Sequence, residues 1–79
     1  MPRYYFDLNN GEWNRDEEGS ECADADHAIA QAKRTLPAIA LDHLPRNGHC
    51  HTLTMLVTDE DARPVYTATL SFNGLAHDR

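Results

Sequence analysis

The N-terminal residues alternate between apolar and polar side chains. From Arg3 to Leu8, every second residue, beginning with Tyr4, is aromatic or aliphatic. This period of two is typical of a strand with one buried face. Asn9-Asn10-Gly11 predicts a tight turn, because Asn and Gly tolerate positive φ angles. Residues 12–15, which include Trp13, are then predicted to run back as a second strand.

A second turn, Asp16-Glu17-Glu18-Gly19, follows that strand, and its side chains are predicted to be solvated. Glycine at position 19 is explained by a left-handed backbone conformation. Residues 20–22 form a short extended exit from this turn.

The middle of the chain changes to a helical period. Apolar residues recur at spacings of three and four, which predicts an amphipathic helix. They are Ala25, Ala28, Ile29, Ala32, Leu36, Ile39, Ala40 and Leu44. Asp24 or Asp26 can cap the first turn. Pro37 lacks an amide donor, but the stripe continues in phase beyond it, which predicts one kinked helix. Pro45-Arg46-Asn47-Gly48 is predicted to end it.

Alternation returns in the C-terminal third and predicts a second hairpin. Its two strands are residues 51–57 and 64–72, joined by a turn at 58–63. The residues predicted to share one face are His51, Leu53, Met55 and Val57 on the first strand, and Tyr66, Ala68, Leu70 and Phe72 on the second. Pro64 opens the second strand, where its missing amide does little harm.

The order strand, strand, helix, strand, strand predicts an α+β fold of ββαββ type. Its antiparallel sheet is covered on one face by the kinked helix. We expect one domain over residues 1–79, with 2–72 structured and 73–79 frayed. A chain of 79 residues buries only about 60–65% of its unfolded surface, so its core is small. The uncovered face of the sheet is free to meet solvent or a partner.

The charge balance bears on the choice of partner and compartment. The net charge is −6, from 13 acidic and 7 basic residues, which argues against nucleic-acid binding. The sequence has no apolar run of the ~20 residues that a membrane span needs, and no apolar signal region. We therefore expect a cytoplasmic protein without a membrane partner, whose Cys22 and Cys50 stay reduced.

The whole pattern resembles a known family. Pro2-Arg3-Tyr4-Tyr5-Phe6, Asp16-Glu17-Glu18-Gly19 and Val57-Thr58-Asp59-Glu60-Asp61 occur in the order found in a small domain-of-unknown-function family of rhizobia and related alphaproteobacteria. The resemblance covers residues 2–72. It supports the fold and implies no established activity. Pro37 and the histidine-rich stretch at 49–51 depart from the family pattern.

Four residues suggest a metal site as an alternative function. His49-Cys50-His51, with His43 upstream, offers imidazole and thiolate donors of the kind that zinc and nickel prefer. On a strand, His49 and His51 would share a face while Cys50 points away. The paired ligand spacing of a structural zinc site is absent. The alternative is thus a small metal- or ligand-binding protein that uses the His43–His51 region.

Catalytic patterns are weaker still. Cys50 lies beside two histidines, but neighbouring strand residues point to opposite faces, so we expect no nucleophile–base pair, no enzyme activity and no cofactor. Small ββαββ-like modules also occur among nucleic-acid regulators, but likeness of fold is a weak warrant for function.

We therefore expect a non-enzymatic protein-interaction or regulatory module, acting as a homodimer or on an unidentified protein partner. The expected contact residues are Tyr5, Trp13 and Leu56, on the uncovered sheet face and a strand edge. On this hypothesis, Leu56→Asp breaks the dimer in a native mass spectrum without unfolding the monomer. A variant that stays dimeric and folded would exclude this interface.

Overall fold

The computed structural model describes residues 1–43 and 50–78, and it confirms the α+β class. The elements are β1 (Arg3–Asn9), β2 (Trp13–Asn14), β3 (Ser20–Glu21), α1 (Ala25–His43), β4 (Cys50–Thr58) and β5 (Pro64–Asn73). The order is ββαββ with one addition, since the exit predicted at 20–22 forms the short strand β3. No helix in the described part of the chain is long and apolar enough to cross a membrane.

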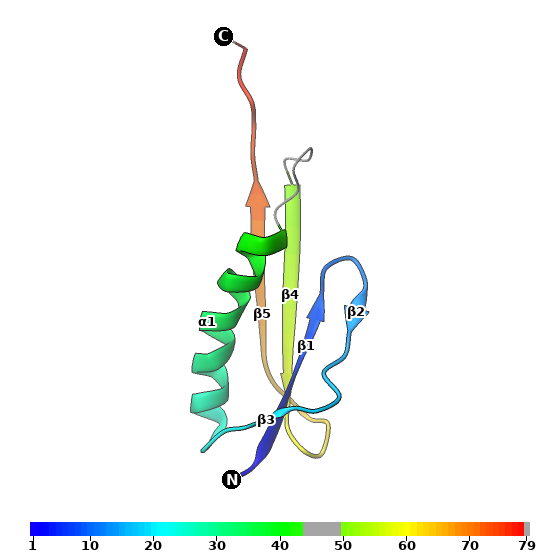
Figure 1. The fold of residues 1–79 in the computed structure, drawn as a ribbon, viewed down its shortest axis with the longest axis vertical. Coiled ribbons are helices and arrows are strands. Elements are labelled where there is room, and N and C mark those ends of the chain that lie inside the picture. Colours follow the sequence, from blue (N-terminus) through cyan, green and yellow to red (C-terminus); the bar gives the residue numbers. More distant parts are fainter. Residues whose placement is uncertain (44–49, 79) are drawn as a thin grey trace.

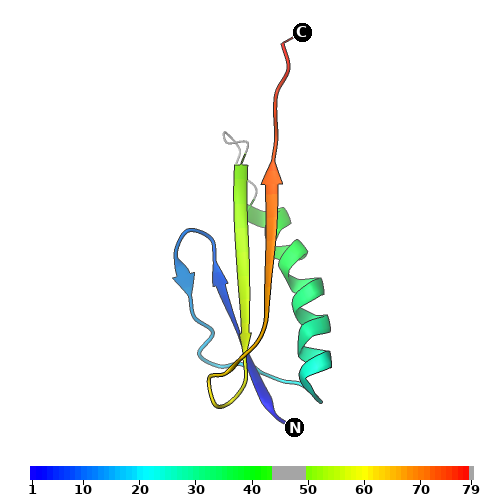
Figure 2. The same cartoon turned by 180° about the vertical axis from the view of Figure 1, so that it is seen from behind.

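The strands form one antiparallel sheet in the order β2-β1-β4-β5, and β3 pairs with the other end of β1. Leu8 lies opposite Met55, and Leu53 lies opposite Leu70. In Figures 1 and 2, α1 lies on one side of the β4–β5 hairpin. The described residues therefore form two layers, a sheet and one helix, and we call the sheet face away from α1 the open face.

β4 is the central strand and supplies the centre of the core. Leu53, Met55 and Val57 are its most buried side chains, each 2% exposed or less. From the helix, Ala28 and Ala32 are fully buried. Alanine has only a methyl side chain, so α1 can lie close to the sheet while the larger β4 side chains fill the space between the layers. The strand faces predicted from alternation are confirmed.

The helix begins where a capping residue was predicted. The carboxylate of Asp24 accepts the amide of His27 at 2.9 Å and contacts the His27 ring Nδ1 at 2.8 Å. This is the bonding pattern of a helix N-cap, so Asp24 rather than Asp26 holds that position. The helix is continuous through Pro37, as the stripe predicted. The predicted helix end at 45–48 lies outside the described residues.

The acidic turn has a structural role that the sequence analysis missed. Tyr4 pairs with Ser20 and Leu8 pairs with Asn14, so the five residues 15–19 span only three positions of β1. The surplus residues interrupt the strand ladder. Asp16 replaces the missing bonds, because its carboxylate accepts the amides of Phe6 at 3.1 Å and of Gly19 at 3.0 Å.

Asp7 completes this arrangement. Its side chain lies on the open face, as predicted, but it is only 6% exposed. One carboxylate oxygen accepts the Asp16 amide at 2.8 Å, and the other lies 3.7 Å from the guanidinium of Arg15. The turn was predicted to be solvated. Its Asp16 instead hydrogen-bonds to β1, whereas Glu17 and Glu18 are exposed. Gly19 has a φ of 72°, as its predicted left-handed conformation requires.

Replacing Asp16 with alanine tests this attachment. The change leaves the part-buried Phe6 and Gly19 amides without their acceptor, which costs about 1 kcal/mol, the lower end of the range for an unsatisfied donor. We expect a loss of that size in the free energy of unfolding, measured by urea titration. Glu17→Ala, at the exposed neighbouring position, is the control and should change it by less than about 0.5 kcal/mol. Equal losses in the two variants would contradict the role given to Asp16.

The N-cap makes stability depend on pH. The side-chain and backbone hydrogen bonds from His27 hold the pKa of Asp24 below its ordinary value of 3.8. A lowered folded-state pKa means that the cap stabilises the fold fully above pH 3.8, and that this contribution is lost as the pH falls through the folded pKa. Asp24→Asn keeps a capping oxygen that does not titrate. Urea unfolding from pH 6 to pH 3 should therefore show a smaller acid loss of stability in the variant. An unchanged acid loss would contradict this role.

Candidate functional site

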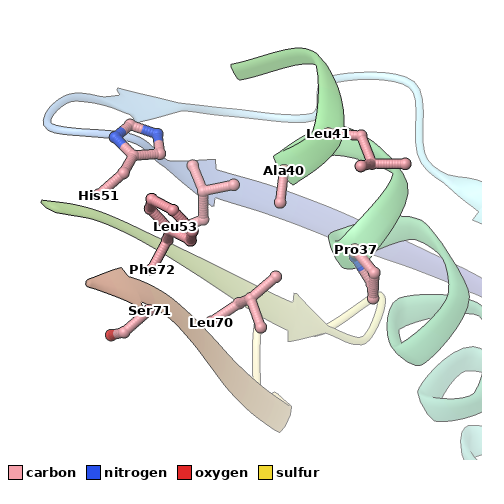
Figure 3. A pocket seen from close by; sticks show the side chains of 8 residues that line it. All are labelled: Pro37, Ala40, Leu41, His51, Leu53, Leu70, Ser71 and Phe72. Carbon is pink, nitrogen blue, oxygen red and sulfur yellow. The ribbon is translucent and has the colours of Figure 1, made fainter. Parts of the chain in front are cut away.

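An apolar groove lies at the far end of the β4–β5 hairpin, between its strands and the last turns of α1. Figure 3 shows the helix residues on one side and the strand residues on the other. Its lining residues are Pro37, Ala40, Leu41, His51, Leu53, Leu70, Ser71 and Phe72. The groove has a volume of about 220 Å³. Small-molecule sites usually occupy about 300–1,000 Å³, so this groove fits a side chain better than an enclosed ligand.

Large apolar side chains are exposed around this groove. Leu41 is 77% exposed, Phe72 45% and Leu70 37%. Leu41 lies on α1, and the other two lie on the same face of β5. The described chain therefore gathers three exposed apolar residues from two elements at one place. Grouped exposure of this kind, unlike a single exposed leucine, is typical of an interaction surface.

The groove is open because the other strands stop short of it. The β1 ladder reaches only Thr54 of β4, while the β4–β5 ladder continues to Cys50 and Asn73. Figure 1 shows the hairpin extending past the tips of β1 and β2. The end of the hairpin is thus a two-stranded ribbon, an arrangement that is marginally stable without cover.

The overall shape is elongated, because the hairpin end and the segment 74–78 after it both project from the body of the domain (Figure 1). The radius of gyration is 14.6 Å, whereas a compact chain of this length has roughly 12 Å. At the same end, the Nε2 atom of His51 is buried and has no hydrogen-bond partner among the described residues. The hairpin end therefore contains a buried polar atom that the described residues leave unsatisfied.

The outer edge of β5 adjoins the groove. β5 is ten residues long, ends the sheet, and contains no Asp, Glu, Lys or Arg. Protein edges are commonly protected by charges, prolines or bulges. Here Pro64 and the irregular pairing at Val57/Thr58 both lie at the start of the strand. The part of β5 from Thr69 to Asn73 has neither, and all five of its residues are exposed.

The three predicted contact residues lie on the open face, but they do not form an apolar patch. Trp13, 49% exposed, pairs with Asn9 at the β2 edge. Leu56 is half-buried between Asp7 on β1 and Thr67 on β5. Tyr5 is also half-buried. Threonines occupy much of the remaining face, with hydroxyl contacts such as Thr54–Thr69 at 3.3 Å.

The predicted metal ligands are not gathered within the described residues. Cys50 is exposed and pairs with Asn73, whereas His51 pairs with Phe72 on the helix-facing side. The two side chains therefore point to opposite faces, as the strand period predicted for adjacent residues. His43 is the last residue of α1, and His49 lies outside the described part of the chain. In that part, no group of three potential ligands is close enough to hold a metal ion.

A second, polar cleft lies between the acidic turn and the β4–β5 turn. It is lined by Tyr5, Asp7, Arg15, Asp16, Glu17, Thr58, Asp59, Glu60 and Ala62. The carboxylate of Asp59 already accepts the amides of Asp61 and Arg63, both at 2.9 Å. These bonds, with the Arg63 guanidinium at 3.3 Å, hold the pKa of Asp59 below its usual value. This carboxylate thus fastens its own turn.

Sequence reasoning missed the groove, although one signal was present. Leu41 follows directly after Ala40 on the helix stripe, and it lies outside the predicted spacing of three and four. An apolar residue off the stripe does not belong to the helix face that packs on the sheet, but by itself it does not identify a contact surface. Leu70 and Phe72 were correctly assigned to the helix-facing side of β5, but the sequence alone did not show that α1 leaves them partly uncovered.

Comparisons with known proteins identify the family without adding an activity. A family model described as a domain of unknown function, DUF6894, matches residues 3–71. Searches of curated proteins and of solved structures returned no match. The matched segment covers β1 to β4 and most of β5, including every groove residue except Phe72.

Proposed function

We propose that this chain, which belongs to the DUF6894 family of unknown function, is a small non-enzymatic protein-interaction module that associates with itself. The observation that carries the proposal is the apolar groove beside the unprotected half of β5. The surface offers main-chain hydrogen-bonding groups along a strand edge and a cavity for side chains next to it. These are the two elements of recognition by strand addition, in which the backbone supplies affinity and the pockets supply specificity.

The groove chemistry supports a non-enzymatic role. Two of the residues that line it carry polar side chains, His51 and Ser71. The Ser71 hydroxyl lies 3.4 Å from the Thr52 hydroxyl, on the open face, while His51 belongs to the opposite face. A nucleophile must lie within hydrogen-bond reach of its base. This separation therefore favours binding over catalysis.

The open face is the competing surface for self-association. Its central apolar residue is Leu56, and the structure shows that Leu56→Asp would be a poor probe. The new carboxylate would lie directly opposite the buried carboxylate of Asp7, and like charges at opposed strand positions are destabilising. Leu56→Thr removes the apolar side chain and matches the neighbouring threonines, so it tests the surface without adding charge.

Leu41→Glu tests the groove. Leu41 is almost fully exposed in the single chain, so the change should leave the monomer folded while placing a charge in the contact. We expect the dissociation constant of the dimer to rise at least about tenfold, because a central contact residue contributes more than about 1.4 kcal/mol. Sedimentation velocity over a concentration series measures this change.

Ala38→Glu is the matched control. It adds the same charge to the same helix at an exposed position outside the groove lining, so it should leave the dissociation constant within about threefold of the parent value. A parent protein that is monomeric throughout would overturn self-association. If Leu56→Thr dissociates the dimer and Leu41→Glu does not, the dimer contact lies on the open face.

A further inference from the structure

We infer that the occupant of the groove and of the β5 edge is a second copy of the same chain, paired antiparallel through residues 69–73 with Ser71 on the two-fold axis. This inference rests on the proposed self-association and specifies its geometry. The two hairpins would form one continuous sheet in the order β4-β5-β5-β4 across the contact, with both helices on the same side.

If two copies associate, the charge distribution selects this place for the contact. The acidic residues of the chain are concentrated in 7–26 and 59–61, with Asp42 and Asp78 besides. The turn that contains residues 59–61 lies at one end of the hairpin, and the free end of β5 lies at the other (Figure 2), beside the groove. Two chains of net charge −6 repel each other. Contact through the uncharged strand β5 keeps most of the acidic groups far apart.

The exposure of β5 fixes the centre of the contact. Residues 69–73 are exposed, whereas Val65, Tyr66 and Ala68 pack against the core. Ser71 is the middle residue of the exposed run. With Ser71 opposite Ser71 of the second copy, Leu70 lies opposite Phe72 of that copy, and Phe72 lies opposite its Leu70. Opposed residues of an antiparallel pair share a face, so the two grooves join into one apolar surface.

The segment beyond β5 is compatible with this register. Residues 74–78 continue in line with β5 and away from the body of the domain (Figure 1). In the paired arrangement they would run along the first half of β5 in the other copy. Gly74 and Ala76 would then fall on the helix-facing side, opposite Ala68 and Tyr66. Leu75, which is 79% exposed in the single chain, would fall on the open face opposite Thr67. The small residues Gly74 and Ala76 of one copy would thus lie where α1 of the other copy leaves little room above β5.

Disulfide trapping tests the register. In a Cys50→Ser background, Ser71→Cys would place two thiols opposite each other across the axis. Directly opposed strand residues have Cα atoms about 4.5–5.5 Å apart, within the range that a disulfide spans. Diamide should convert most of this variant into a covalent dimer on non-reducing gels. Thr67→Cys is the matched control, also exposed and on the open side of β5, and it should stay monomeric on the gel because its thiols are four positions from the axis.

A second pair of variants keeps the test decisive if Ser71→Cys disturbs the fold. Mixed Thr69→Cys and Asn73→Cys proteins should form a mixed disulfide, because residues 69 and 73 are opposed in this register. A protein that sediments as a dimer but forms neither disulfide, or in which Thr67→Cys crosslinks equally well, overturns the register and leaves the proposed function standing. A protein that sediments as a monomer overturns both.

Discussion

The structure depends on the burial of β4 beneath α1. Leu53, Met55 and Val57 are almost completely removed from water, and each apolar side chain buried in this way stabilises the fold by about 1.5–3 kcal/mol. β4 is also the strand through which β1 and β5 are joined. Because α1 packs over β4, it covers only the part of the sheet that lies next to that strand. The size of this contact therefore determines which parts of the sheet are covered and which apolar side chains stay exposed.

The two ends of the molecule meet this constraint differently. At the β1 end, the surplus residues of the acidic turn fold back, and Asp16 and Asp7 replace the interrupted strand ladder with side-chain hydrogen bonds. At the other end, the β4–β5 hairpin continues beyond the β1 ladder, and Leu70 and Phe72 are only partly covered by the helix. The polar end is internally satisfied, whereas the apolar end is where another chain can add most contacts.

This asymmetry connects the fold to the proposed function. The acidic residues concentrated in 7–26 and 59–61 oppose non-specific association through those parts of the surface. The uncharged strand β5 and its groove interrupt that surface at one place. An apolar site away from the acidic residues favours association through that site, since approaches through the acidic parts bring like charges together.

The sequence by itself determined the α+β class, the strand faces, the start of α1 near Asp24 or Asp26 and the continuity of α1 through Pro37. Each follows from local periodicity or from a residue's own backbone preference. The tertiary structure alone decided that Asp7 is buried and that Asp16 holds the acidic turn, because both depend on residues brought together by the surplus length opposite β1. It likewise decided that exposed apolar residues are grouped at the groove, whereas on the open face Trp13 is exposed and Tyr5 and Leu56 are half-buried. Exposure there depends on where β1 and α1 end relative to the hairpin, and alternation along a single strand carries no information about how far its neighbours extend.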